Sequence, residues 1–286
     1  MPQPTIIQDT DYLQNDQYKN SANLDARAAL HRRFRTAVTP WPVWVFDQLE
    51  LQEGTAVLEC GCGPGWLWRE NLARIPANCP ITLTDLSPGM VAEAETALQN
   101  SDHDFRFQTA NIQELPFPDC SFDVVIANHM LYHVPNLPQA LREVRRVLKG
   151  NGRFFTATNG QNHLRELWQI GRELWPAEDS PLHSLVTAEW TLSFRLENGA
   201  AQLTTVFPQV SLLRYDDHLA VTEVEPILDY LFSSSFIGDE VRPAPEIIAQ
   251  VRQKLTQQIA RDGAIYITKD TGLFYSSGIR SFLHPL

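Results

Sequence analysis

A glycine-rich stretch between residues 59 and 65 is the part of this sequence best suited to binding a ligand. It reads Glu-Cys-Gly-Cys-Gly-Pro-Gly, the pattern E-x-G-x-G-x-G, and follows the apolar run TAVLEC at 55–60. Glycines at the carboxyl end of a strand let the backbone turn sharply and let a ligand approach without meeting a Cβ atom. A dinucleotide-binding loop would carry its third glycine one position later, where this chain has Trp66, and the Gly-Lys-Ser/Thr of a phosphate-binding P-loop is missing. We therefore expect a ligand-binding turn, with NAD or FAD as the less favoured ligand.

Two further polar residues follow the next two strand-like segments. Asp85 ends PITLTD (80–85), and an acid at this place can accept hydrogen bonds from both hydroxyls of a ribose. Asn111 follows DFRFQTA (104–110) and can pair with the exocyclic amine of an adenine, while Met90 can pack on the ring. Taken singly, Asp85 could be only a helix cap, Asn111 only a turn former and Met90 only a core residue. Together they predict a ligand with a ribose and an adenine.

The elements that must position these residues alternate between strand-like and helix-like segments. Strands are expected at 55–60, 80–85, 104–110, 121–128 and 152–159, with helices at 65–75, 87–98 and 137–149. This alternation predicts an α/β fold with a Rossmann-like, doubly wound, mostly parallel sheet. After Gly160 we expect helices at 162–175, 224–235 and 245–263, a strand at 210–215 and an antiparallel last strand within 265–278.

Composition excludes several classes of protein. The 286 residues carry 23 Lys and Arg against 34 Asp and Glu, a net charge of −11, which disfavours nucleic acid as a partner. No stretch approaches the ~18 apolar residues of a membrane span, and the first residues lack the basic and apolar regions of a secretory signal. The expectation is a cytoplasmic protein without a membrane partner. The four cysteines show neither a CxxC pair nor a zinc-binding spacing, so we expect free thiols and no metal.

Four segments, read together, resemble a known family. They are VLECGCGPG (57–65), ITLTDLSPGM (81–90), ELPFPDCSFDVVIANHMLYHV (114–134) and LREVRRVLKGNGRFF (141–155). In order and spacing they resemble the class I S-adenosylmethionine-dependent methyltransferases, most closely the type 11 branch of ubiquinone-type and small-molecule enzymes. The resemblance covers about residues 55–160. It implies S-adenosylmethionine as the cofactor and S-adenosylhomocysteine as its product.

The resemblance also implies a role for individual residues. The methionine end of the cofactor is assigned to the glycine-rich turn, the ribose to the end of the second strand, the adenine to the end of the third, and one residue at the end of the fourth strand completes the site. The residues concerned are Glu59, Gly61, Cys62 and Gly63, then Asp85, Leu86 and Met90, then Asn111 and Ile112, and finally Asn128. The family often has Asp where this chain has Asn111, so the bond to the adenine amine loses charge assistance.

The acceptor side of the site is expected after the fourth strand. His129 and His133 stand there, and a neutral imidazole can take a proton from a hydroxyl or an ammonium group. Equally, the two histidines could only shape the cofactor site. No Asp/Asn-Pro-Pro-Tyr/Phe and no Pro-Cys nucleophile is present, which argues further against methylation of nucleic acid bases.

Three regions are therefore expected: an N-terminal helical cap at 1–52, an S-adenosylmethionine-binding core at 53–160, and a substrate lid insertion with closing strands of the same sheet at 161–286. The lid is aromatic, with Trp168, Trp175, Trp190, Phe194, Tyr230 and Phe232, although each could belong only to its core. The leading functional prediction is transfer of a methyl group to an O, N or C atom of a small metabolite or natural product. A NAD-type oxidoreductase and a non-catalytic cofactor-binding or assembly protein are the alternatives.

Overall fold

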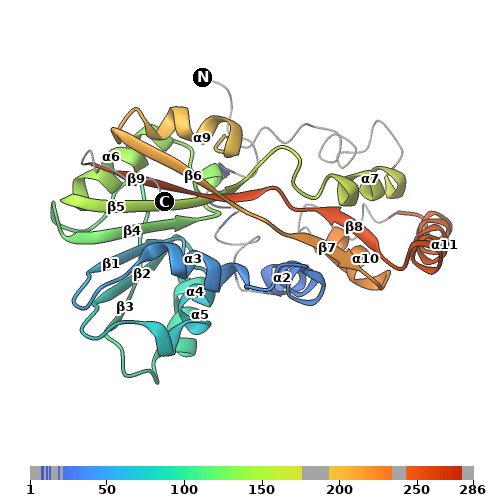
Figure 1. Ribbon diagram of the computed structural model, residues 1–286, viewed down its shortest axis with the longest axis horizontal. Helices are drawn as coiled ribbons and strands as arrows, with labels where there is room; N and C mark the ends of the chain where they lie inside the picture. Colours follow the sequence, from blue (N-terminus) through green and yellow to red (C-terminus); the bar gives the residue numbers. More distant parts are fainter. Residues whose placement is uncertain are drawn as a thin grey trace.

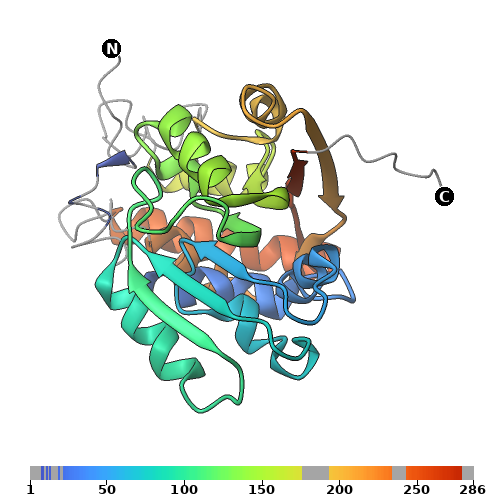
Figure 2. The same cartoon turned by 90° about the vertical axis from the view of Figure 1, so that its left-hand side faces the viewer.

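The computed structural model describes residues 22–175, 193–233 and 243–278, with residues 8, 9, 11, 13 and 19 before them. A seven-stranded sheet runs through the larger part of the molecule in the order β3-β2-β1-β4-β5-β9-β6 (Figures 1 and 2). Neighbouring strands from β3 to β5 are parallel, whereas β9 is antiparallel to both β5 and β6. The predicted Rossmann-like, mostly parallel sheet with an antiparallel last strand is confirmed. Its strands are β1 (Val57–Cys60), β2 (Ile81–Asp85), β3 (Phe105–Thr109), β4 (Phe122–Asn128), β5 (Leu148–Asn159), β6 (Gln209–Tyr215) and β9 (Thr271–Ser277).

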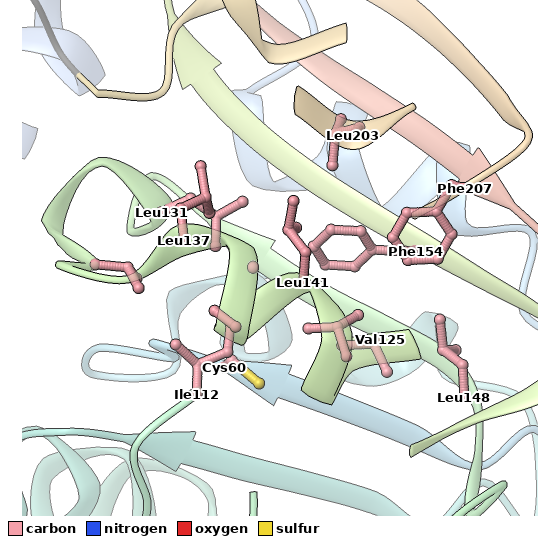
Figure 3. Close-up of a cluster of buried hydrophobic side chains, with 14 of the residues drawn as sticks. Cys60, Ile112, Val125, Leu131, Leu137, Leu141, Leu148, Phe154, Leu203 and Phe207 are labelled. Carbon is pink, nitrogen blue, oxygen red and sulfur yellow. The ribbon is translucent and has the colours of Figure 1, made fainter. Parts of the chain in front are cut away.

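Successive residues of a strand point to opposite faces of the sheet, and here both sets include apolar side chains. Helices therefore cover both faces of the sheet. Phe154 belongs to the core on one face, with α6 (Leu137–Val147) and α9 (Leu196–Leu203), and Phe155 to the core on the other. Figure 3 shows the first core, in which the rings of Phe154 and Phe207 stack with centroids 5.5 Å apart. The second core contains side chains of α3 (Trp41–Leu49), α4 (Trp66–Arg69) and α5 (Pro88–Leu98).

A two-stranded ribbon extends the sheet beyond its carboxyl edge. β6 continues after two residues into β7 (His218–Val221), and β8 (Ile265–Thr268) continues after two residues into β9, with β7 and β8 antiparallel. The ribbon holds a third apolar core together with four helices, seen on the right of Figure 1. These helices are α2 (Ala22–Phe34), α7 (Arg165–Leu174), α10 (Glu225–Phe232) and α11 (Pro245–Asp262).

The structure differs from the sequence expectations in three places, one of which is helix α9, where no helix was expected. The helix expected at 65–75 is divided into α4 and the 3-10 turn η3 (Leu72–Arg74), since the Asn71 side chain donates to the carbonyls of Leu67 and Pro42. Strand β7 was not expected at all. Trp190 lies outside the described residues. In the part of the chain that the structure describes, no helix combines the length and apolarity needed to cross a membrane.

Candidate functional site

The glycine-rich turn after β1 is tied to the neighbouring strand at the carboxyl edge of the sheet. The backbone N–H groups of Gly61 and Cys62 both donate to the carbonyl oxygen of Thr84, at 2.7 and 3.0 Å. Three glycines of the turn have positive φ angles, of 72° at Gly61, 53° at Gly63 and 74° at Gly65. Residues other than glycine rarely adopt positive φ angles. The backbone of the turn therefore requires glycine at these three positions.

The surroundings of these glycines differ. A Cβ atom on Gly61 would lie 2.8 Å from Cγ of Met130, and one on Gly65 would lie 3.0 Å from a side chain of α5. These two positions are closed by packing. No heavy atom of the described residues lies within 4 Å of the place where a Cβ on Gly63 would be. Gly63 is therefore the position of the turn that a ligand can approach directly.

Asp85, at the end of β2, faces this turn. One carboxylate oxygen accepts the N–H of Gly63 at 3.0 Å and the other accepts the N–H of Ser87 at 2.9 Å. Burial raises the pKa of Asp85, and hydrogen bonds from the backbone of Ser87, Gly63 and Leu86 oppose this rise. The carboxylate therefore fixes the turn, and its remaining acceptor capacity is available to a ligand hydroxyl.

Glu59 lies beneath the turn and is 3% exposed. Its Oε2 accepts the indole N–H of Trp68 at 2.6 Å. Burial raises the pKa of Glu59 to about 8, and the nearby charge of Asp85 adds to the rise while the Trp68 bond opposes it. A cation placed next to these two carboxylates would stabilise their ionised forms.

The predicted adenine side is built by the end of β3 and the residue that follows it. The N–H of Ala110 donates to the Asp85 carbonyl at 3.0 Å, which joins this segment to β2. Oδ1 of Asn111 accepts the backbone N–H and the side-chain amide of Gln113, at 2.9 and 3.3 Å. Asn111 therefore forms a turn, which is the alternative role that the sequence left open for it. A ligand amine would have to displace the longer bond, from the side-chain amide of Gln113.

Other residues assigned to the cofactor by the resemblance are mostly buried. Ile112 lies in the core of Figure 3 beside the end of β1, and Met90 is buried in the first turn of α5. Leu86 is half-buried directly after Asp85. Cys62 is buried, and burial raises the pKa of its thiol.

The end of β4 carries a buried polar atom without a partner. Oδ1 of Asn128 has no hydrogen-bond partner among the described residues. A buried acceptor of this kind is costly unless a ligand or water satisfies it. His129 follows with a φ of 53°, its N–H donating to the carbonyl of Ala157 at 2.9 Å. His133 lies on the next 3-10 turn, with its ring 4.5 Å from that of Tyr132.

The structure gathers three histidines from distant segments at this edge. His31 comes from α2, His129 from the end of β4 and His163 from the segment after β5, and the rings of His31 and His163 stack with centroids 6.2 Å apart. Burial lowers the pKa of His31 to about 3 and of His129 to about 4, and places that of His163 well below its usual value. All three imidazoles are therefore neutral at pH 7.

A buried ion pair lies next to these histidines. Lys269 and Asp217 occupy the junction of the two ribbon strands with the sheet, with Nζ and Oδ2 2.5 Å apart and side chains 8% and 0% exposed. Oδ1 of Asp217 also accepts the N–H groups of Thr36 and Ala37, which attaches the segment after α2 to the ribbon. Lys269 lowers the pKa of all three histidines.

Aromatic rings border the same place. The ring of Trp41 lies 5.3 Å from that of His129 and 5.1 Å from that of Tyr215, and Tyr230 lies 6.0 Å from His31. The indole N–H of Trp168 donates to the carbonyl of His163 at 3.1 Å. Two of the predicted lid aromatics, Tyr230 and Trp168, therefore lie beside the histidines. Two others, Trp175 and Phe194, are buried in cores, and Phe232 packs edge-on against Trp175.

Sequence reasoning missed His31, His163 and Lys269. Of the two histidines that it proposed, the structure brings His129 into this cluster and places His133 with Tyr132. No sequence motif surrounds the three missed residues, which stand far apart in the chain. Their common signal is burial of a titratable side chain, which only the fold reveals. Among the described residues, no group of three or more His, Cys, Asp or Glu side chains could hold a metal ion.

Comparison with known proteins identifies the part of the chain that carries the turn. Residues 58–156 match the profile of a methyltransferase domain family. Malonyl-(acyl-carrier protein) O-methyltransferase of Erwinia billingiae is 36% identical over 124 residues, covering 41% of this chain and 45% of that protein. The 27-O-demethylrifamycin SV methyltransferase of Amycolatopsis mediterranei is 36% identical over 110 residues, covering 37% and 39%. The chain thus spans about half the length, or less, of these curated relatives.

Solved structures show the same fold at low sequence identity. Phosphoethanolamine N-methyltransferase 2 of Haemonchus contortus, in complex with S-adenosyl-L-methionine, has a TM-score of 0.57 at 14% identity, covering 96% of this chain and 60% of that one. The YcgJ protein of Bacillus subtilis has a TM-score of 0.52 at 18% identity, covering 84% and 98%. Residues 58–156 therefore match a methyltransferase domain, and the chain shares the fold of these solved structures.

Proposed function

We propose that this protein transfers a methyl group from S-adenosylmethionine to an O, N or C atom of a small organic molecule. One observation carries the proposal: the domain-family match contains the glycine turn, Asp85 and Asn128, which meet at one edge of the sheet with open space at Gly63. A ligand that bridges the ends of β1, β2 and β4 satisfies the atoms that the fold leaves available there.

The residues present fit the cofactor part by part. The Asp85 carboxylate suits the ribose hydroxyls, because it is held in place by the N–H groups of Gly63 and Ser87 and is an acceptor only. The ammonium group of the methionine end would lower the pKa of buried Glu59 and favour its ionised form. Oδ1 of Asn128 would accept a hydrogen bond that the described residues do not supply.

The adenine assignment is the part of the fit that requires a rearrangement. Asn111 can offer its oxygen to the adenine amine once the side-chain amide of Gln113, at 3.3 Å, is displaced. Three apolar side chains lie on this side of the site: Leu86 directly after β2, Met90 in α5 and Ile112 in the turn after β3. We assign the adenine to this side on the resemblance and on the join between Ala110 and Asp85.

Chemistry at the site follows from the properties of a sulfonium methyl, which the cofactor supplies in an already activated form. The protein must hold the acceptor lone pair in line with the S–CH3 bond and keep water away. The buried histidines and the rings of Trp41, Tyr215 and Tyr230 lie at the same carboxyl edge, so we assign the acceptor to them. The helices held by the ribbon would then act as the substrate lid, and the N-terminal helices as the cap.

The names of the relatives point to small molecules and to an acyl group on a carrier protein, and they do not fix the acceptor atom. Their names include O-methyltransferases and a ubiquinone/menaquinone C-methyltransferase, while a structural neighbour is named as an N-methyltransferase. Nucleic acid stays outside the proposal because the chain has a net charge of −11. Cytoplasmic action on a metabolite remains part of the proposal.

Isothermal titration and a methyl-transfer assay test the function. We expect saturable binding of S-adenosylhomocysteine and no comparable binding of NAD, because Trp66 stands where a dinucleotide loop needs its third glycine. Incubation with methyl-labelled S-adenosylmethionine and a metabolite extract should move label into a small molecule. Binding of NAD instead would favour the oxidoreductase, and cofactor binding without any transfer would favour the non-catalytic protein.

A further inference from the structure

We infer that the methyl acceptor is a carboxylate, held by His31 and His163 beside Lys269, so that the product is a methyl ester. This inference rests on the proposed function and names the substrate class of the same site. It uses three residues that lie outside the methyltransferase domain match, which ends at residue 156.

The hydrogen bonds of His163 fix which of its nitrogens carries the proton. Nδ1 accepts the backbone N–H of Asp270 at 3.2 Å, so in the neutral ring the proton is on Nε2. The hydroxyl of Thr271, 3.2 Å from the same Nδ1, donates its proton to Asn159 at 2.8 Å. His163 therefore presents Nε2–H as a donor and has no basic nitrogen free.

His31 supplies the second group. Its ring stacks on His163, and its Nδ1 is buried without a hydrogen-bond partner among the described residues. In the tautomer that carries its proton on Nδ1, this nitrogen is a donor that lacks an acceptor. A carboxylate at the edges of the two stacked rings, where their N–H groups point, would accept from both histidines and satisfy the buried atom.

The charges at this place favour an anion. Lys269 lowers the pKa of all three imidazoles, whereas its partner Asp217 raises that of His31. The cluster therefore lies in a net positive field that Asp217 only partly cancels. An anionic acceptor gains from this field, and an ammonium acceptor loses.

The weak basicity of these histidines favours a carboxylate over a hydroxyl as the methyl acceptor. Moving a proton from a phenol, of pKa ~10, to an imidazole with the pKa of about 4 found for His129 is uphill by about six pKa units. A carboxylate has no proton to lose. One of its oxygens forms the O–CH3 bond, the S–CH3 bond breaks with its electron pair going to sulfur, and the products are a neutral ester and a neutral thioether.

Product stability in base gives the first test. The protein would be incubated with methyl-tritiated S-adenosylmethionine and either octanoate, benzoate, octanol, phenol or a metabolite extract. Methyl esters release volatile tritiated methanol in dilute alkali, whereas ethers, amines and C-methyl groups keep the label. We expect label transfer to be base-labile and confined to the acids and the extract.

Variants give the second test. His163→Phe removes the Nε2–H donor and keeps a ring, so the KM for the labelled acid should rise ~10- to 100-fold with unchanged affinity for S-adenosylhomocysteine. His163→Gln retains a side-chain donor and should recover much of the loss. His218→Phe is the matched control, because the His218 side chain is exposed on β7 and only its backbone forms hydrogen bonds with Thr36.

The outcomes of these tests distinguish failure of this inference from failure of the proposed methyltransferase function. If the transferred label is stable in base, the acceptor is not a carboxylate, whereas the proposed methyltransferase function is still supported. An unchanged KM in His163→Phe, with base-labile product, would remove His163 from the acceptor site and refute the inference as stated. Absence of transfer to any acceptor, despite cofactor binding, would refute the proposed function and the inference with it.

Discussion

Replacing Asp85 with alanine tests the link between the fold and the cofactor most directly. The two carboxylate oxygens already accept the N–H groups of Gly63 and Ser87, and their remaining acceptor capacity would serve the ribose hydroxyls. Because both new bonds would share one buried carboxylate, we take their combined net value as that of a single charge-assisted interaction, ~1.5–3 kcal/mol. Asp85→Ala should therefore weaken binding of S-adenosylhomocysteine by ~10- to 150-fold.

A double-mutant cycle separates the ribose contact from a general loosening of the turn. Isothermal titration would compare wild type and Asp85→Ala with S-adenosylhomocysteine and with its 2′,3′-dideoxy analogue. If Asp85 binds the hydroxyls, the analogue should bind the wild type weakly, and the substitution should then cost little more. Asp104→Ala, at an exposed aspartate just before β3, is the matched control and should bind normally.

Two results would refute this reasoning. One is an affinity within twofold of wild type in a folded Asp85→Ala protein. The other is an equal loss for both ligands, which would show that Asp85 only holds the turn. Thermal unfolding of each variant establishes that the comparison is made on folded protein.

The remaining predictions concern the turn, the buried acid beneath it and the ion pair. Glu59 has its folded pKa raised from 4.5 to about 8, so its contribution to stability is full below pH ~4.5 and is lost as the pH rises towards 8. Urea unfolding at pH 6 and pH 8 should show a smaller fall in stability for Glu59→Gln than for wild type. Gly61→Ala should cost at least ~2 kcal/mol, because φ is 72° and the new Cβ meets a side chain at 2.8 Å. Gly63→Ala, with open space, should cost only ~1 kcal/mol in urea unfolding but weaken S-adenosylhomocysteine binding. Lys269→Met should destabilise the protein by ~3–5 kcal/mol, and adding Asp217→Asn should recover part of the loss.

Each of these has a contrary outcome. An identical pH dependence in Glu59→Gln would mean that Glu59 is ionised in the free protein. Equal effects of the two alanine variants on stability and on binding would contradict the division of the turn into packed and open glycines. Full stability of Lys269→Met alone would show that Asp217 is satisfied by Thr36 and Ala37 without the ion pair.

Local patterns in the sequence were sufficient to predict the sheet and the turn. Strand and helix periods are properties of adjacent residues, and the three glycines coincide with three positive φ angles. The helix expected at 65–75 was wrong in its length because Asn71 uses its amide to end α4, a hydrogen bond that no periodicity shows. The four-residue strand β7 was missed because no glycine-rich turn follows it, whereas such a turn marks the end of the equally short β1.

The acceptor side could be predicted only in part. His129 follows β4, and the end of a central strand is a place where function is expected from topology alone. His31, His163 and Lys269 reach the same place because β9 returns between β5 and β6, and because α2 packs on the ribbon. Such convergence depends on the complete arrangement of the chain, and a single sequence contains no spacing that encodes it.

The position of β9 also determines the order in which this protein can fold during synthesis. Strands β1 to β4 pair only with strands of the set β1 to β5, so residues 57–159 can form most of their part of the sheet soon after they leave the ribosome. β6 has no neighbour in the sheet except β9, which begins 55 residues after β6 ends. At a synthesis rate of ~5–20 residues per second this interval lasts several seconds. Throughout it, β6 and the open edge of β5 are unpaired, because both pair with β9. Helices α10 and α11 emerge within this interval, and slow translation there would lengthen the exposure of two unpaired strand edges to aggregation.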